Sequence, residues 1–489
     1  MKRLIVFLGC VIFSIKISCA LTYIYVDELA VNNQSLAERI NQAVDGSLKK
    51  YGYAYVKFTK GKTYVFSRSI ILKENVTIDG NGCIIKFNTT PDIHAMYPYN
   101  SFLTNRKIIE SGRSINAYTY QILGEKNIIV KNIDFECGGD NQFWFNVNCE
   151  RGVITLHGAE NVIIDHVIFN NMYRNTPIWM TNMKNVEIKN CQFLESFDNN
   201  NQQSSCGGIW TNTGNYLDHI SIHDNRFVNY RDESISIFCN GKETLRYVDH
   251  INIYNNVFNS RYYAITMSGS NASGTVNIHN NHFNDFDNQT SALTFEVGSY
   301  RKLEITNNIF NSQSARSVMT VVAKIAIDSL VFENNKIAHG DLVYSYLPSI
   351  RKLCKVTGNT FCNASMILSV TCYVPMYIEH NIFHIRNAKD GILFNINNGQ
   401  EHDIIADNEF DIRRSDGVML LAKYGYGYSS CKNRLAFTDN NVSFQNTSTP
   451  FFHNDEDGKI ITMFISGNTF HGLSRQSLMK RTTKNCKWN

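Results

Sequence analysis

The sequence repeats one short pattern along most of its length. An alternating run of apolar and polar residues ends in Asn-x-Phe or a close variant, as in "INIYNNVF", "VNIHNNHF" and "LEITNNIF". The residue that closes the pattern recurs every 22 to 34 residues, a period typical of solenoids, in which each repeat packs against its neighbours. Its copies are Phe135, Phe169, Phe193, Phe227, Phe258, Phe283, Phe310, Ile337, Phe361, Phe383, Phe410, Val442 and Phe470.

The alternation indicates strands, because side chains of a strand point to opposite faces in turn. The segments between the repeats show no helical periodicity and are too short for a helix with two strands. We therefore expect an all-β solenoid of short strands, in which about 13 coils stack at about 4.8 Å with backbone hydrogen bonds along the axis.

An asparagine recurs two positions before the closing residue. We expect these asparagines at the corner after each strand, in the left-handed αL conformation that asparagine tolerates, with their amides bonded from coil to coil as a ladder. The Phe or Ile that follows is expected to turn inward as a stacked core residue. The asparagines are Asn225, Asn256, Asn281, Asn308, Asn335, Asn359, Asn381, Asn408, Asn440 and Asn468.

The register of these repeats resembles that of the pectate-lyase-like superfamily, over nearly all of the chain beyond its first residues. The resemblance implies a single-domain right-handed parallel β-helix with an N-terminal capping helix, for which "QSLAERINQAVDGSLKKYG" has apolar residues at helical spacing. A cap is needed because a bare coil end exposes apolar core and an unpaired edge. The expected boundaries are residues 1–20 for a signal peptide, 21–60 for the cap, and 61–489 for the parallel β-helix with a short C-terminal tail.

The first residues, "MKRLIVFLGCVIFSIKISCA", have the basic start, apolar stretch and small final residue of a secretory signal cleaved after Ala20. A lipoprotein signal around Cys19 is the weaker alternative, because Lys16 stands where such signals carry an apolar residue. No later stretch is apolar enough to span a membrane. We therefore expect a secreted or periplasmic protein.

Charge and cysteine content exclude some functions. The net charge is only +4 over 489 residues, without a basic block or an arginine-rich helix, which argues against a nucleic-acid partner. Of 13 cysteines, 11 follow the signal, so at least one thiol is left unpaired. Burial among apolar residues is the favoured role for Cys354, Cys362 and Cys372, and no Cys/His spacing indicates zinc.

A second short strand follows each corner, and six of these strands align as "RGVITLHG", "NTPIWMTN", "CGGIWTNT", "DESISIFC", "YYAITMSG" and "TSALTFEV". We take Ile154, Ile178, Ile209, Ile235, Ile265 and Leu293, with the residues two positions later, as inward. The residues between them are then expected to face solvent. One outward row reads Thr155, Trp179, Trp210, Ser236, Thr266 and Thr294. The neighbouring row reads His157, Thr181, Asn212, Phe238, Ser268 and Glu296.

Two outward tryptophans on consecutive coils are unusual on a solvated sheet. Tryptophan rings stack on the apolar faces of sugars, and arginines fork onto uronate or sulfate groups. We therefore expect a groove that binds an acidic polysaccharide. An alternative is that both tryptophans form a satellite core under the connecting loops. The expected binding residues are Arg174, Trp179, Trp210, Arg231, Arg261 and Tyr262.

The candidate catalytic residues are Asp232, Glu233, Glu296 and His157. The segment that runs Asp232-Glu233-Ser-Ile-Ser-Ile resembles the adjacent carboxylates that enter a strand in polygalacturonase-like hydrolases. Neither Asn-Thr-Asp before it nor Gly-His-Gly on the following coil is present, and the arginine signature of pectate lyases is also absent, so no activity family is identified. The structural alternatives are solvated turn residues or arginine partners for the acidic pair, a surface or loop-bonded histidine, and a plain carboxylate on a strand.

Two chemistries fit these residues. An inverting hydrolase needs an acid and a base carboxylate about 6.5–9.5 Å apart. Because Asp232 and Glu233 point to different faces, Glu296 or Glu150 is the expected second carboxylate. A β-eliminating lyase needs a base near the uronate α-proton and a cation for the carboxylate. For that reaction the candidates are Arg174, Arg261, Tyr262 and His157.

The sequence thus favours an exported polysaccharide-active enzyme, a lyase or a glycoside hydrolase. The alternative is a non-catalytic glycan-binding, adhesive or exopolysaccharide-assembly protein, which needs only the aromatic and amide rows. No cofactor and no metal ligand are assigned, with calcium left open at the acidic turn "HNDEDGK" (His453–Lys459). The expected partner is a polysaccharide, and the sequence gives no oligomeric state.

Overall fold

The structure is a computed structural model. It describes residues 22–87, 102–104, 124–137, 152–172, 176–195, 207–211, 216–228, 233–239, 247–260, 263–284, 291–312, 317–322, 325–339, 341–345, 349–362, 368–372, 374–385, 392–397, 401–413, 420–425, 434–445, 452–454, 461–472, 474–480 and 486–488.

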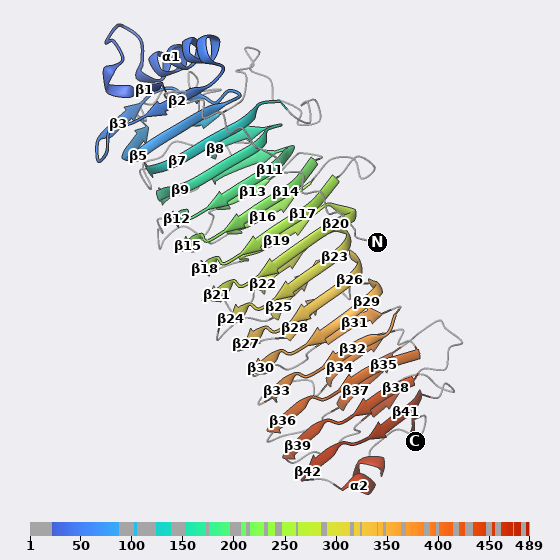
Figure 1. Ribbon diagram of the computed structural model, residues 1–489. Helices are drawn as coiled ribbons and strands as arrows, with labels where there is room; N and C mark the ends of the chain where they lie inside the picture. The colour runs from blue at the N-terminus through green and yellow to red at the C-terminus, as the bar shows by residue number, and fades with distance from the viewer. Residues whose placement is uncertain are drawn as a thin grey trace, which may run out of the picture.

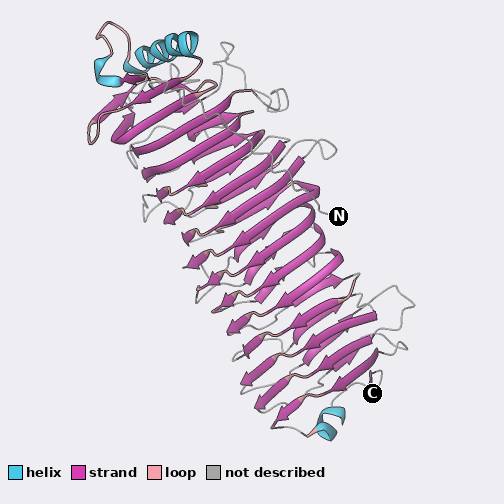
Figure 2. Ribbon diagram, in the orientation of Figure 1, coloured by secondary structure: helices cyan, strands magenta, loops and turns pink. Residues whose placement is uncertain are grey.

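Each repeat forms one coil of short strands, and the coils stack into a long rod (Figure 1). One coil, for example, consists of β14 (Tyr216–His223), β15 (Arg226–Val228) and β16 (Ile235–Phe238), each of which pairs in parallel with its equivalent on the next coil. Strands dominate the rod from end to end (Figure 2). The chain therefore has the all-β, parallel β-helix fold that the repeat predicts.

Two hydrogen-bonded sheets run along the rod, and we call the larger one sheet A and the ten-stranded one sheet B. Sheet B consists of β4 (Ile70–Ile71), β6 (Leu103–Thr104), β8 (Gly152–His157), β10 (Thr176–Thr181), β13 (Ile209–Thr211), β16 (Ile235–Phe238), β19 (Ile265–Ser268), β22 (Ser291–Phe295), β25 (Ser317–Val321) and β28 (Asp341–Ser345).

Sheet A bends at a corner in every coil. The strands before the corner are β1 (Tyr23–Tyr25), β2 (Ala54–Lys57), β11 (Met183–Lys189), β14, β17 (Tyr247–Tyr254), β20 (Ser270–His279), β23 (Gly298–Thr306), β26 (Ile325–Glu333), β29 (Ser349–Thr357), β32 (Met376–Glu379), β35 (Glu401–Ala406), β38 (Arg434–Thr438) and β41 (Ile461–Ser466). Three longer strands run through the corner: β5 (Val76–Phe87), β7 (Lys126–Glu136) and β9 (Glu160–Met172). The strands after it are β3 (Thr63–Phe66), β12 (Gln192–Glu195), β15, β18 (Val257–Asn259), β21 (His282–Asn284), β24 (Ile309–Phe310), β27 (Lys336–Ile337), β30 (Thr360–Cys362), β33 (Ile382–Ile385), β36 (Glu409–Arg413), β39 (Asn441–Gln445) and β42 (Thr469–His471). A further ladder of sheet A consists of β31 (Leu368–Cys372), β34 (Ile392–Asn397), β37 (Leu420–Gly425) and β40 (Phe452–Asn454). The last strand, β43 (Cys486–Trp488), pairs with β41.

The asparagine ladder is present in the interior of these corners. The side-chain amide of Asn308 donates to Oδ1 of Asn335 over 3.0 Å, and the same bond links each predicted ladder asparagine to the next. These bonds run through Asn225, Asn256, Asn281, Asn308, Asn335, Asn359, Asn381, Asn408, Asn440 and Asn468.

The αL conformation, however, falls one residue earlier than predicted. Positive φ occurs at Asp224 (56°), Asn255 (55°) and Asn307 (56°), each of which directly precedes a ladder asparagine. The expectation that the ladder asparagines themselves adopt αL is therefore wrong. The residue that turns the chain points out of the coil, whereas the following amide points into the interior, where only another amide and the backbone satisfy it.

The closing phenylalanines form a stacked column inside the rod. Phe227 and Phe258 are fully buried with ring centroids 5.0 Å apart, and Phe258 and Phe283 repeat that distance. Offset stacking of this kind adds to the burial of each ring. The predicted inward direction of the closing residues is confirmed.

Both ends of the rod carry a helix (Figure 1). At the N-terminal end α1 (Leu36–Tyr51) begins with a capping box between Ser35 and Glu38, and its buried Ile40 packs into the core of the coils. At the other end α2 (Arg475–Lys480) buries Leu478 against the same core. A short 3-10 helix, η1 (Val26–Glu28), precedes α1. Neither α-helix in the described part of the chain is long and apolar enough to cross a membrane.

Several cysteine thiols belong to the core. Cys83, Cys137, Cys191, Cys239 and Cys354 are buried and not in disulfides. Burial raises the pKa of Cys83 and of Cys191 to about 12, so these thiols stay protonated and unreactive at neutral pH.

Candidate functional site

The outward row of sheet B has the register that the sequence predicts. Thr155 pairs with Trp179, Trp179 with Trp210, and Trp210 with Ser236. Ser236 pairs with Thr266, and Thr266 with Thr294. We call these six residues, one per consecutive coil from β8 to β22, the sheet B row.

The expectation that this row faces solvent is wrong. Thr155, Ser236, Thr266 and Thr294 are at most 2% exposed and Trp179 is 8% exposed, while Trp210 is half-buried. Strand alternation determines only which residues point away from the core of the coil. It does not report whether other parts of the folded chain lie over that face.

The two tryptophans stack on each other, with ring centroids 5.6 Å apart and planes inclined by 22°. Neither indole N–H has a hydrogen-bond partner among the residues that the structure describes, although both nitrogens are buried. A buried tryptophan usually finds such a partner. The pair is therefore largely buried, as a satellite core would be, but no described residue bonds to either indole nitrogen.

The hydroxyl groups of the row share this property. Oγ of Ser236 and Oγ1 of Thr266 and Thr294 are buried without a hydrogen-bond partner in the described part of the chain. With Trp179 and Trp210, they place five unsatisfied polar atoms on five consecutive coils. Each such atom costs about 1–3 kcal/mol unless water or a ligand bonds to it.

The structure spreads the described catalytic candidates along sheet B. Glu233 is half-buried at the entrance to β16, and Glu296 is half-buried just beyond the end of β22. Two coil spacings and about five residues of strand separate them, or about 19 Å at 4.8 Å per coil and 3.3 Å per residue. An inverting acid and base are about 6.5–9.5 Å apart, so these two carboxylates do not form that pair.

His157 lies far from both carboxylates. His157 pairs with Thr181 on the next coil, and Phe238, Ser268 and Glu296 follow in the same row on later coils. Glu296 is five coils away from His157, or about 24 Å. His157 is 6% exposed, and its Nδ1 lies 2.6 Å from Oγ1 of Thr181. The histidine is thus buried and bonded to a residue of the neighbouring strand β10.

The remaining candidates lie outside the described residues: Arg174, Arg231, Asp232, Arg261 and Tyr262. The acidic part of the proposed calcium turn, residues 455–459, also lies outside them.

Glu296 is the described candidate with a perturbed acidity. Burial raises the pKa of its carboxyl above the ordinary 4.5, and a hydrogen bond from Ser268 opposes that rise. A carboxyl with a raised pKa can remain protonated where an ordinary one ionises, which suits a general acid.

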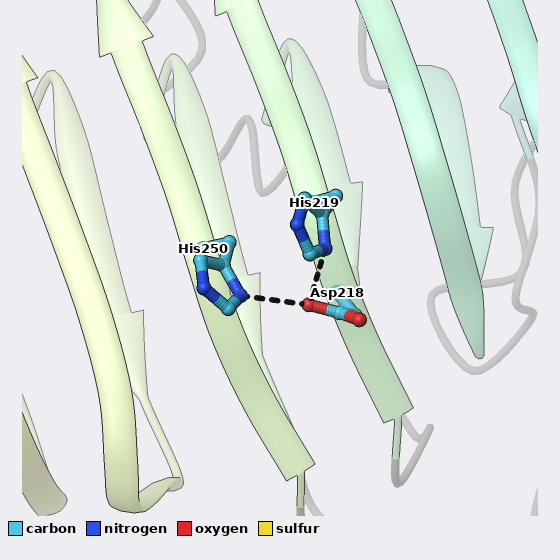
Figure 3. Close-up of side chains that lie close together, drawn as sticks. All are labelled: Asp218, His219 and His250. Atoms are coloured by element: carbon cyan, nitrogen blue, oxygen red, sulfur yellow. Dashed lines mark hydrogen bonds and ion pairs between the residues drawn. The ribbon is translucent and has the colours of Figure 1, made fainter. Parts of the chain in front are cut away.

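Sequence reasoning assigned no metal ligands, but the structure gathers three candidates on the outer side of sheet A. Asp218, His219 and His250 each offer one ligand atom, and the three atoms lie within 4.8 Å of one another (Figure 3). A signal for this cluster was present in the sequence, since Asp-His-Ile occurs at residues 218–220 and again at 249–251, at equivalent positions of neighbouring coils.

Comparisons with known proteins found similar solved structures only. No protein-family model matches the sequence, and no curated protein matches it. The chain is similar to the surface adhesin PfbA of Streptococcus pneumoniae (12% identity, 96% of this chain and 100% of that chain, TM-score 0.41) and to a hyperthermoactive exopolygalacturonase from Thermotoga maritima (12% identity, 92% of each chain, TM-score 0.42). It is also similar to a tailspike protein of E. coli bacteriophage HK620, solved in complex with a hexasaccharide (10% identity, 95% of this chain and 80% of that chain, TM-score 0.34). The strand pairing of the chain itself defines it as a parallel β-helix protein.

Proposed function

We propose that this protein is exported and binds a polysaccharide along the sheet B row. Because the side chains of the row are buried in the ligand-free structure, the glycan reaches them only by displacing what covers them. The observation that carries the proposal is the line of five buried polar atoms that have no hydrogen-bond partner among the described residues, two of them on stacked indoles. Sugars complement such a row, because their C–H faces pack on tryptophan and their hydroxyl groups both donate and accept hydrogen bonds.

The spacing of the row favours a polymer over a small molecule. One polar group recurs on each coil, about every 4.8 Å along the rod, over five consecutive coils. A linear glycan offers hydroxyl groups at regular intervals along a similar length. The signal-like residues 1–20 favour a location outside the cytoplasm, where such polymers are found.

A panel of acidic and neutral polysaccharides tests the proposal. We expect the full chain to bind at least one member of the panel, measured by affinity electrophoresis and by titration calorimetry. Tyr254→Ala is the matched control, because Tyr254 stacks between His223 and His279 on sheet A, away from the row, and should leave binding unchanged. No binding to any member of a broad panel would contradict the proposal.

Cleavage of the bound glycan, by a lyase or a hydrolase, is the second candidate function, and the raised pKa of Glu296 favours it. The same incubations give the readout, since a lyase produces ultraviolet-absorbing unsaturated ends and a hydrolase produces only reducing ends. If products form, Glu296→Gln should abolish them and leave binding intact. Binding without products would leave the protein a glycan-binding β-helix.

The acidity of Glu296 also predicts how stability depends on pH. Because burial raises its pKa on folding, the folded chain holds the proton more tightly than the unfolded chain does. The stabilisation is complete below the ordinary pKa of 4.5 and is lost as the pH rises through the folded value. The melting temperature of the Glu296→Gln variant, minus that of the native chain, should therefore increase as the pH is raised from 4 to 8. A difference in melting temperature that does not vary with pH would show that folding does not raise the pKa of Glu296.

A further inference from the structure

A second corner in sheet A carries its own row of αL residues. Asn127, Asn161 and Asn185 have φ between 53° and 59°, and Nδ2 of each of the last two donates to Oδ1 of the preceding one over 3.0 Å. His219 (φ 54°) and His250 (φ 52°) hold the equivalent positions on the next two coils. Histidine thus replaces asparagine at two adjacent steps of an amide ladder.

The two imidazoles converge on one carboxylate (Figure 3). Nδ1 of His219 lies 2.7 Å and Nδ1 of His250 3.1 Å from Oδ1 of Asp218. The rings stack with centroids 4.2 Å apart and planes inclined by 21°. Zinc bonds of about 2.0–2.1 Å in a tetrahedron place the ligand atoms about 3.3 Å apart, which is close to the two nitrogen–oxygen distances. The rings must turn out of their stack for both nitrogens to point at one ion, because a metal lies in the plane of each imidazole that binds it.

The surroundings support the ligand set. The Asp218 side chain is only 9% exposed, and the hydroxyl group of Tyr216 bonds to its Oδ2 over 3.4 Å, which fixes the carboxylate. Asp249 accepts a bond from the backbone N–H of His250 over 2.8 Å, and its other oxygen pairs with Arg301 over 3.6 Å, which offsets the negative charge that it brings near the site. Such outer contacts orient metal ligands and strengthen them.

The imidazoles themselves are open to solvent. The His219 and His250 side chains are 54% and 42% exposed, so an ion reaches them without a rearrangement of the fold. His219 also borders a concavity of about 380 Å³, whose lining includes Asn161 and Glu187. Three protein ligands leave at least one coordination position of a tetrahedral ion for water or for a ligand in that concavity.

We propose that Asp218, His219 and His250 bind a divalent transition-metal ion of the zinc class. Two imidazole nitrogens select zinc, copper or nickel over calcium and magnesium, which prefer oxygen ligands. The site lies on sheet A and is independent of the glycan-binding row on sheet B. Failure of either proposal therefore leaves the other standing.

Titration of the full chain with ZnCl₂ tests the site, with metal content and the visible spectrum of the Co²⁺ form as further readouts. The variant His219→Asn/His250→Asn should lose zinc affinity on the order of 100-fold or more, since outer contacts alone are worth 10–100-fold. It should keep the fold, because asparagine occupies the same αL position on the three preceding coils. Zinc at 100 times its dissociation constant should raise the melting temperature of the native chain but not of this variant.

His166→Asn is the matched control. His166 is also an αL histidine (φ 53°) whose Nδ1 meets the preceding aspartate, Asp165, over 2.6 Å, but asparagines, Asn132 and Asn190, hold its position on both neighbouring coils. The His166→Asn variant should bind zinc with the affinity of the native chain. The proposal is overturned if the native chain binds no zinc, or if zinc affinity is the same in the His219→Asn/His250→Asn variant, or if the control loses as much affinity as that variant.

Discussion

Replacing Asn308 by alanine should lower the free energy of unfolding by about 3–5 kcal/mol. Its Oδ1 accepts bonds from the backbone N–H of Asn281 (2.9 Å) and from the side-chain amide of Asn281 (3.1 Å), and its Nδ2 donates to Asn335 (3.0 Å) and to the carbonyl of Ile278 (2.8 Å). The side-chain amide of Asn281 keeps its bonds to Ile253 and His279, and Oδ1 of Asn335 keeps the backbone N–H of Asn308. The buried backbone N–H of Asn281 and carbonyl of Ile278 lose their bonds to Asn308, at about 1–3 kcal/mol for each group left unsatisfied. Urea denaturation followed by circular dichroism measures the loss.

The neighbouring residue provides the control. Asn307 is exposed and has a φ of 56°, so it supplies the turn while Asn308 supplies the ladder. Glycine adopts αL without strain, and Asn307→Gly should therefore change the free energy of unfolding by less than about 1 kcal/mol. Equal losses of unfolding free energy in the two variants would mean that Asn308 stabilises the protein through the corner and not through the amide ladder.

Removing three hydroxyl groups from the sheet B row should make the protein more stable. Ser236→Ala, Thr266→Val and Thr294→Val each delete a buried oxygen that has no partner among the described residues and retain most of the side-chain shape. At the low end of the cost of an unsatisfied group, about 1 kcal/mol each, the triple variant should gain about 3 kcal/mol in free energy of unfolding. The gain is expected in the ligand-free protein, measured by the same denaturation experiment.

Thr320 tests whether the gain arises from the missing partners. It pairs with Thr294 in the next strand of the same sheet, but its Oγ1 lies 2.5 Å from the hydroxyl group of Ser291. Thr320→Val should therefore lower stability, by about 1 kcal/mol or more. If the triple variant is no more stable than the native chain, ordered water already satisfies the three hydroxyl groups, and the main argument for a ligand is lost.

Much of the fold could be predicted because the repeat fixes residues relative to one another. The position of Asn256 in its repeat predicts both its ladder partner and the inward direction of Phe258, and both predictions are confirmed. The αL position was misplaced by one residue because Asn255 and Asn256 have the same side chain. Sequence alone does not show which of two adjacent asparagines faces solvent.

The candidate site was harder to predict because it depends on what covers a strand and on distances between coils. The register placed Trp179 and Trp210 side by side, but it could not show that both indole nitrogens are buried without a partner in the described part of the chain. It also placed Glu233 and Glu296 on one sheet without showing that about 19 Å separates them. The Asp218 cluster was missed because its metal-ligand spacing spans two coils rather than a few residues of sequence.

The affinity of the triple variant for a polysaccharide that binds the native chain is the most direct test of the central claim. If the row exists to bind glycan, the variant Ser236→Ala/Thr266→Val/Thr294→Val should bind at least about tenfold more weakly, since each lost hydrogen bond is worth about 0.5–1.5 kcal/mol. It should do so while being more stable than the native chain, so that misfolding does not account for the loss. An unchanged affinity in the stabilised variant would contradict the claim and would place the glycan elsewhere on the rod.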